Sequence, residues 1–235
     1  MPSAKNSWTP RVFVLAASVL LLGGCQQFFT FSLAKSLARA PSPLTSISAD
    51  QAAALVAAKP DQALAASAVG ALATLVTANP TSASVVSDAA QVAVIATGLD
   101  AALTQSLATV LTSGGSLTTT DIATMSSLLS AAASNVNAST TSIFTTLSTQ
   151  AASNPTALAA SGTSAQTLVV AATAVALSDA VSQGLSIADV INGTSTYTPS
   201  ASVSTTLSNL ASGVSAIDPG NALLSTLQSS FNITF

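Results

Sequence analysis

The residues that could do chemistry in this chain of 235 amino acids are mainly aspartates, serines and threonines. The chain contains no histidine, so the usual general base near neutral pH is absent. All eight acidic residues are aspartates, and paired-carboxylate catalysis would have to use these alone. Asp179 and Asp189 could approach each other across a turn, but the aspartates are dispersed and several fit better as helix caps. A hydrolase with a Ser/Asp site stays open as an alternative, although no serine is singled out.

Metal and phosphate sites are not indicated by the remaining motifs. Asp218-Pro219-Gly220-Asn221 lacks the ligand spacing of a calcium loop and is better explained as a tight turn. Gly114-Gly115 is followed by no lysine, as a phosphate-binding loop would require. We therefore expect no catalytic residue, no metal and no cofactor, and the sequence identifies no small-molecule ligand.

The N-terminal segment has the organisation of an export signal. Lys5 and Arg11 precede an apolar run over 12–22, which is too short for a comfortable transmembrane helix. Two glycines and the single cysteine of the chain follow this run, and one cysteine excludes an intrachain disulfide bond. The pattern predicts a cleaved signal, with an uncleaved membrane anchor as the alternative.

The motif Leu22-Gly23-Gly24-Cys25 resembles the lipobox of bacterial lipoproteins. The resemblance implies that Leu22, Gly23 and Gly24 are read by the signal peptidase and that residues 1–24 are removed. It also implies that Cys25 carries acyl chains such as palmitate, which anchor the chain to a membrane of the cell envelope. Gln26 stands where an aspartate would favour the inner membrane, which points to the outer membrane, on its periplasmic side or at the cell surface.

Residues 25–46 are predicted to be the lipidated cysteine, a juxtamembrane segment and a linker. In a helix, Phe29 would share one side with two leucines, whereas Lys35 and Arg39 would lie on the opposite side near lipid phosphates. Phe28 falls toward the basic side, so the amphipathic pattern is imperfect. A first core helix of the domain is an equally supported interpretation.

The charge pattern argues against nucleic acid as a partner and indicates a surface with few charged groups. Charged residues make up 6% of the chain, where about 25% is usual, and Ser, Thr, Asn and Gln supply the polarity instead. After loss of residues 1–24, three basic residues would face eight aspartates, a net charge of −5. No Lys or Arg follows Lys59, so nucleic acid binding is not expected. With so few titratable groups, we expect folding to depend weakly on pH.

Apolar residues recur at alternating steps of three and four, which predicts helices. The longest seam begins at Val85 and continues to Val110, with Asp88, Gln91, Thr97 and Thr104 on an uncrowded opposite side. Ser48 and Gln51 match a capping box. The predicted helices span 48–58, 61–78, 83–112, 120–135, 139–152, 163–184, 200–215 and 221–230.

These elements predict an all-α domain over 47–235, a multi-helix antiparallel bundle with close-packed seams rich in Ala and Ser. Segments 67–81 and 142–156 share spaced residues and an Asn-Pro-Thr triplet, so two weakly related helical halves are one interpretation. We expect a non-catalytic structural or binding module, with a protein partner or a homo-oligomer among its contacts. A membrane-inserting or pore-associated lipoprotein is the other alternative, because Ala66, Gly70 and Thr74 form a row of small residues.

Overall fold

The structure is a computed structural model that describes residues 48–58, 61–112, 118–191 and 194–221. All of them belong to the second of two units of the chain, Pro43–Phe235. This part of the chain is helical and contains no strand, so the predicted all-α multi-helix bundle is confirmed. The helices are α2 (Ala49–Ala58), α3 (Gln62–Ala78), α4 (Ala83–Thr97), α5 (Leu99–Thr112), α6 (Thr119–Ser134), α7 (Ala138–Ser153), α8 (Pro155–Ala160), α9 (Ala165–Ser182), α10 (Ile187–Ile191) and α11 (Ala201–Ile217).

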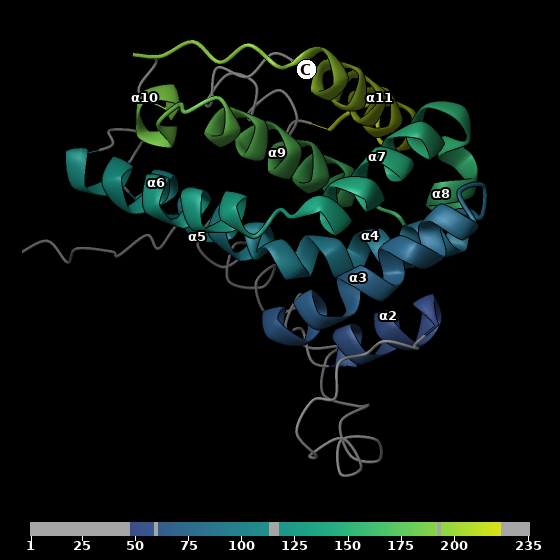
Figure 1. Cartoon of the computed structure of the whole chain (residues 1–235). Helices are drawn as coiled ribbons and strands as arrows, with labels where there is room; N and C mark the ends of the chain where they lie inside the picture. Colours follow the sequence, from purple (N-terminus) through teal and green to yellow (C-terminus); the bar gives the residue numbers. More distant parts are fainter. Residues whose placement is uncertain (1–47, 59–60, 113–117, 192–193, 222–235) are drawn as a thin grey trace, which may run out of the picture. The chain divides into compact units, whose positions relative to one another are not determined.

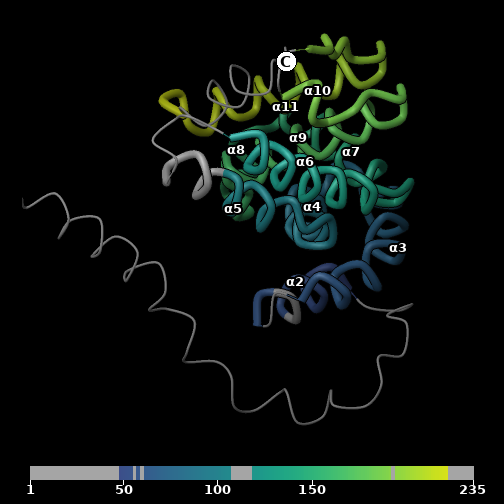
Figure 2. The backbone as a smooth tube through the Cα atoms, turned by 90° about the vertical axis from the view of Figure 1, so that its left-hand side faces the viewer, coloured from purple at the N-terminus to yellow at the C-terminus, as the bar shows by residue number. Residues whose placement is uncertain are grey.

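The bundle is organised around α4 and α9. Helix α4 packs against α2, α3, α7 and α9, and α9 in turn packs against α11 and α6. Figures 1 and 2 show α2 and α3 at one side of the bundle and α10 and α11 at the opposite side. Every residue of α9 from Leu168 to Leu177 is buried, which explains why this helix lacks a polar face.

The core is built from small side chains, as the Ala-rich seams predicted. Alanine is the commonest residue among the buried apolar side chains of the described part of the chain. Helices approach closely at Gly213, where an added Cβ would lie 2.6 Å from the Cβ of Ala151 and 3.0 Å from Cδ1 of Leu168. Small residues therefore let α11 approach α7 and α9 closely, at the cost of little buried area per residue.

The predicted helix over 83–112 is wrong, because it is two helices that meet at Gly98 with a bend of 60°. The apolar seam continues across the bend, with Leu99 and Leu103 both buried, so periodicity alone hides it. Gly98 has a φ of 70°, in the left-handed region where glycine ends helices without steric cost. The expected uncrowded face is also wrong in part: Thr97 is buried and Asp88 is half-buried.

Most other boundaries agree with prediction to within two residues. The capping box at α2 is confirmed, with Ser48 Oγ accepting from Gln51 N at 3.3 Å and Gln51 Oε1 accepting from Ser48 N at 3.2 Å. The short helices α8 and α10 were not predicted, since five or six residues show no period. Val181 continues the three-and-four spacing of apolar residues in α9, but it is 43% exposed in the last turn of that helix. The predicted helix 221–230 lies almost entirely outside the described residues.

The two Asn-Pro-Thr triplets both end a helix. Asn79 and Asn154 have nearly the same backbone angles, φ −131° with ψ 54° and φ −143° with ψ 53°. A residue before proline is disfavoured in the helical region, so this local rule by itself accounts for the similarity. The duplication of a helical unit stays a prediction.

Candidate functional site

The residues predicted to serve lipidation lie outside the described part of the chain. These are Leu22, Gly23, Gly24 and Cys25 of the lipobox, together with Phe28, Phe29, Lys35 and Arg39 of the juxtamembrane segment. The candidate site is therefore built from the helical domain.

Most aspartates of the domain lie at helix N-termini. Asp61 is the N-cap of α3, and its Oδ1 accepts hydrogen bonds from Ala63 N at 2.9 Å and Leu64 N at 3.2 Å. Asp121 forms a capping box with Thr118 at the start of α6. The hydrogen bonds from the hydroxyl and the amide of Thr118 lower the pKa of Asp121. Such carboxylates satisfy free amide groups and compensate the helix dipole.

Asp179 organises a cluster of polar groups at the C-terminal end of α9. Its Oδ2 accepts from the Tyr197 hydroxyl at 2.9 Å, from Gln183 Nε2 at 2.9 Å and from Ser200 N at 3.0 Å. Its Oδ1 accepts from Ser200 Oγ at 3.0 Å. Burial, the hydrogen bond to Asp179 and the charge of Asp179 raise the pKa of Tyr197. The carboxylate thus fastens the segment before α11 to α9.

Asp179 and Asp189, which the sequence would allow to approach each other across a turn, bind different side chains. Asp189 Oδ1 accepts from Thr194 Oγ1 at 3.2 Å, and among the described residues the two aspartates share no hydrogen-bond partner. Ser200 is the serine that contacts Asp179, and both its hydroxyl and its backbone amide point to that carboxylate. This geometry ties Ser200, the N-cap residue of α11, to α9, and neither Ser200 nor Asp179 lines either of the two grooves described below.

Side chains from other helices donate hydrogen bonds to the backbone carbonyls at the C-terminal end of α4. Its last two carbonyls belong to Ala96 and Thr97, which lack partners within the helix. Gln62 Nε2, from α3, donates to the Ala96 carbonyl at 3.2 Å, and Asn135 Nδ2, at the end of α6, donates to the Thr97 carbonyl at 3.2 Å. Three helices therefore meet at the bend beside Gly98. Sequence reasoning missed both amides because their partners are 34 and 38 residues away.

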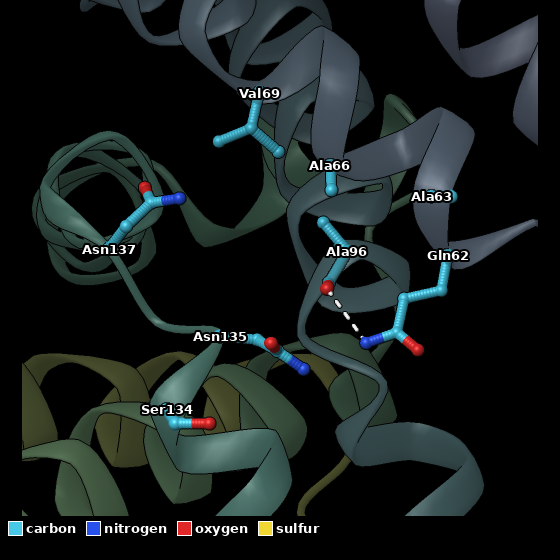
Figure 3. Close-up of a pocket in the computed structure, with 8 residues that line it drawn as sticks. All are labelled: Gln62, Ala63, Ala66, Val69, Ala96, Ser134, Asn135 and Asn137. Atoms are coloured by element: carbon cyan, nitrogen blue, oxygen red, sulfur yellow. Dashed lines mark hydrogen bonds between the residues drawn. The ribbon is translucent and has the colours of Figure 1, made fainter.

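These amides border the larger of the two grooves described in the domain (Figure 3). The groove has a volume of about 420 Å³, within the range of small-ligand sites. Its lining residues are Gln62, Ala63, Ala66, Val69, Ala96, Ser134, Asn135 and Asn137. The α3 side is mostly apolar and the α6–α7 side is polar, and no lining residue is charged or aromatic.

The groove has hydrogen-bond donors and acceptors that its own residues do not use. Gln62 and Asn135 use their amide nitrogens on the α4 carbonyls. Asn137 uses its Oδ1 to cap α7, accepting from Thr140 N at 3.0 Å. Within the described part of the chain this leaves two amide oxygens and one amide nitrogen for a ligand.

The second groove, of about 240 Å³, lies between α4 and the start of α9. Its polar groups already bind each other, since Gln166 Nε2 donates to Asp100 Oδ1 at 3.2 Å. Among the described residues, no three His, Cys, Asp or Glu side chains cluster to hold a metal ion.

One described helix, α9, has the length and apolar composition to cross a membrane, and the bent pair α4 and α5 would qualify if counted as one span. About two thirds of the α9 residues are buried inside the bundle, as expected for the central helix of a helical domain. The row at Ala66, Gly70 and Thr74 lies on the exposed side of α3.

Comparison of the whole chain with protein-family models, with curated proteins and with solved structures finds no match.

Proposed function

We propose that this chain is a lipoprotein of the bacterial cell envelope, anchored through Cys25, whose helical domain binds a neutral ligand without catalysis. The anchor rests on the resemblance of Leu22-Gly23-Gly24-Cys25 to a lipobox. The binding role rests on one observation, the uncharged, amide-lined groove between α3 and the α6–α7 connection.

The distribution of the aspartates supports a binding role over a catalytic one. Asp61, Asp121 and Asp179 each accept hydrogen bonds from groups at a helix N-terminus. The oxygens of a carboxylate used in this way already accept hydrogen bonds within the fold, so they are not free to take a proton from a substrate. The chain has no histidine to replace it.

The polarity of the groove indicates the class of ligand. Neutral amides form hydrogen bonds with hydroxyl and amide groups but offer no charge to bind an ionic ligand. Ala63, Ala66 and Val69, on the other side of the groove, can pack against an apolar edge of the same ligand. A neutral glycan with acetamido groups, of the kind that a surface polymer offers, has this combination. The occupant that we propose is an N-acetylated saccharide.

The saccharide test uses the full chain in mild detergent, with an N-acetylglucosamine tetramer as the probe. We expect side-chain amide NMR signals of Gln62, Asn135 and Asn137 to shift with a Kd on the order of 1 mM. Ala66→Trp should fill the groove and abolish the shifts. Ala152→Trp, at an exposed position of α7 that lines neither groove, is the matched control and should preserve them. Unmoved amide signals at several millimolar saccharide would contradict the proposed ligand.

The anchor is tested separately by metabolic labelling with an alkyne-bearing palmitate. Wild-type chain should be labelled and sediment with membranes, whereas Cys25→Ser should lose both properties. A Cys25→Ser/Ser36→Cys double variant returns one thiol to the chain, and it should stay unlabelled because the lipobox position is lost. Label on that double variant would show that acylation does not depend on the motif.

A further inference from the structure

The chain after α11 continues through the single Asp–Pro peptide bond of the sequence, Asp218–Pro219. Asp218, Pro219 and Gly220 are exposed, so water has access to this bond. The backbone amide of Asn221 donates to the Asp218 carbonyl at 3.1 Å, which is the hydrogen bond of a tight turn. The carbonyl of the Asp–Pro bond is therefore polarised by a backbone donor.

The Asp218 carboxylate is held on the same side as the residues that follow this bond. Asn221 Nδ2 donates to Asp218 Oδ2 at 3.0 Å, and a Cβ added to Gly220 would lie 3.9 Å from Asp218 Oδ1. Among the described residues no hydrogen bond engages Oδ1, so this oxygen keeps its lone pairs for another use. A nucleophilic oxygen and a polarised carbonyl thus belong to one residue, and Asn221 contacts both groups.

Two Asn–Pro bonds of the domain lack this arrangement. The Asn79 carbonyl accepts from Ser82 N at 3.1 Å, the same turn contact, but Asn79 Nδ2 donates back to the Leu75 carbonyl at 3.0 Å. Asn154 Nδ2 also donates to a preceding residue, Ser153 Oγ, at 3.2 Å. Both side chains are neutral amides held by residues before the proline, so these two bonds are natural controls for the Asp–Pro bond.

We propose that the chain cleaves its own Asp218–Pro219 bond, with Asp218 as the nucleophile and Asn221 as a positioning residue. Asp218 Oδ1 attacks the backbone carbonyl carbon of Asp218 and forms a five-membered cyclic anhydride. The bond from this carbon to the Pro219 nitrogen breaks, and the nitrogen takes a proton from water and leaves as a secondary amine. Water then opens the anhydride to two carboxyl groups, so each cleavage consumes one water molecule and needs no oxidant or reductant.

The turn supplies two things that accelerate this reaction. The Asn221 backbone amide donates to the carbonyl oxygen on which negative charge develops during the attack, as the donors of an oxyanion hole do. The Asn221 side chain restricts the carboxylate to the neighbourhood of the carbonyl carbon, which reduces the entropy lost on reaching the transition state. Cleavage would separate the residues from 219 onward from the helical domain that ends with α11.

The test is incubation of the purified full chain in mild detergent and mildly acidic buffer, with mass spectrometry of the fragment that begins at Pro219. The fragment should accumulate about tenfold faster from the folded chain than from the same chain unfolded in concentrated urea. The Asn79–Pro80 and Asn154–Pro155 bonds should stay intact in both samples. Asp218→Ala should abolish the fragment, because it removes the nucleophile from an exposed position and leaves the proline in place.

Two further variants separate positioning from other causes. Asn221→Ala keeps the backbone donor but loses the side-chain contact, and it should slow cleavage about tenfold while the thermal unfolding temperature stays the same. Asp100→Ala removes an exposed aspartate that no proline follows and should cleave at the wild-type rate. Absence of the fragment from the wild type, or equal rates in the folded and unfolded chain, would overturn the proposal. So would a fragment from Asp218→Ala, which would assign the cut to a contaminating protease, or an unchanged rate in Asn221→Ala.

Discussion

The substitution Gly98→Ala tests how the bend between α4 and α5 is held. Gly98 has a φ of 70°, where an alanine costs about 1–2 kcal/mol. A Cβ at Gly98 would also lie 2.7 Å from Gln62 Nε2, at the flexible end of that side chain. The amide would move away and release the Ala96 carbonyl, a further loss of about 1 kcal/mol. We therefore expect Gly98→Ala to lower the free energy of unfolding by about 2–3 kcal/mol.

Gly184→Ala is the matched control, because Gly184 has a φ of 77° and no atom within 4 Å of an added Cβ. Gly184→Ala should lower the free energy of unfolding by the backbone strain alone, about 1–2 kcal/mol. Thermal unfolding followed by circular dichroism separates the two, since 1 kcal/mol corresponds to about 2–4 °C for a domain of this size.

A double-mutant cycle isolates the contribution of the Gln62 amide. In a Gln62→Ala background the hydrogen bond to Ala96 is already absent, so Gly98→Ala should cost no more than Gly184→Ala does. The two changes should then be non-additive by about 1 kcal/mol. Additive costs, or equal costs of Gly98→Ala and Gly184→Ala in the wild-type background, would refute the assignment of Gln62 to the helix end.

Gly213→Ala should destabilise the domain by about 1–3 kcal/mol, because the new Cβ meets Ala151 at 2.6 Å, and denaturant unfolding measures it. Gly70→Ala should stabilise by about 0.5–1 kcal/mol in the same assay, since the site is an open, exposed helix interior, and a loss would contradict that environment. Asp179→Asn should lower the free energy of unfolding by about 2–3 kcal/mol. It should also lower the pKa of Tyr197, the single tyrosine, which is measured from phenolate absorbance. An unchanged tyrosine titration would mean that the carboxylate does not control this pKa. Because the folded-state pKa of Asp88 is raised from 3.8 to about 6, the folded state binds the extra proton in that window, and stability should fall as the pH rises through it. Solvent contact reduces the effect to about 1 kcal/mol, and Asp88→Asn should flatten the profile.

The pH prediction refines an expectation drawn from composition. Few titratable groups implied weak coupling of folding to pH, and the count of charges could not reveal that two aspartates meet. Asp50 and Asp88 are on different helices and 38 positions apart in sequence, with unremarkable local patterns. Only the packing of α2 on α4 buries Asp88 beside Asp50 and so raises the pKa of Asp88.

The candidate groove is likewise a product of packing. Gln62 at the start of α3 and Asn135 at the end of α6 resemble ordinary surface amides in the sequence. Their roles depend on the end of α4, where two carbonyls require donors. The one local feature that indicates the end of α4 is Gly98, and the apolar spacing of three and four that continues on both sides of it predicts an unbroken helix instead.

The order of residues along the chain was enough to specify helices, most of their ends and the alanine-rich character of the core. These features follow from interactions within a few residues: the three-and-four spacing of apolar side chains, caps such as Ser48 with Gln51, and asparagine before proline. The bend at Gly98, the amides that meet there and the carboxyl pair were decided by the tertiary structure. Each joins atoms from separate helices, and whether such groups meet depends on crossing geometry that no local spacing encodes.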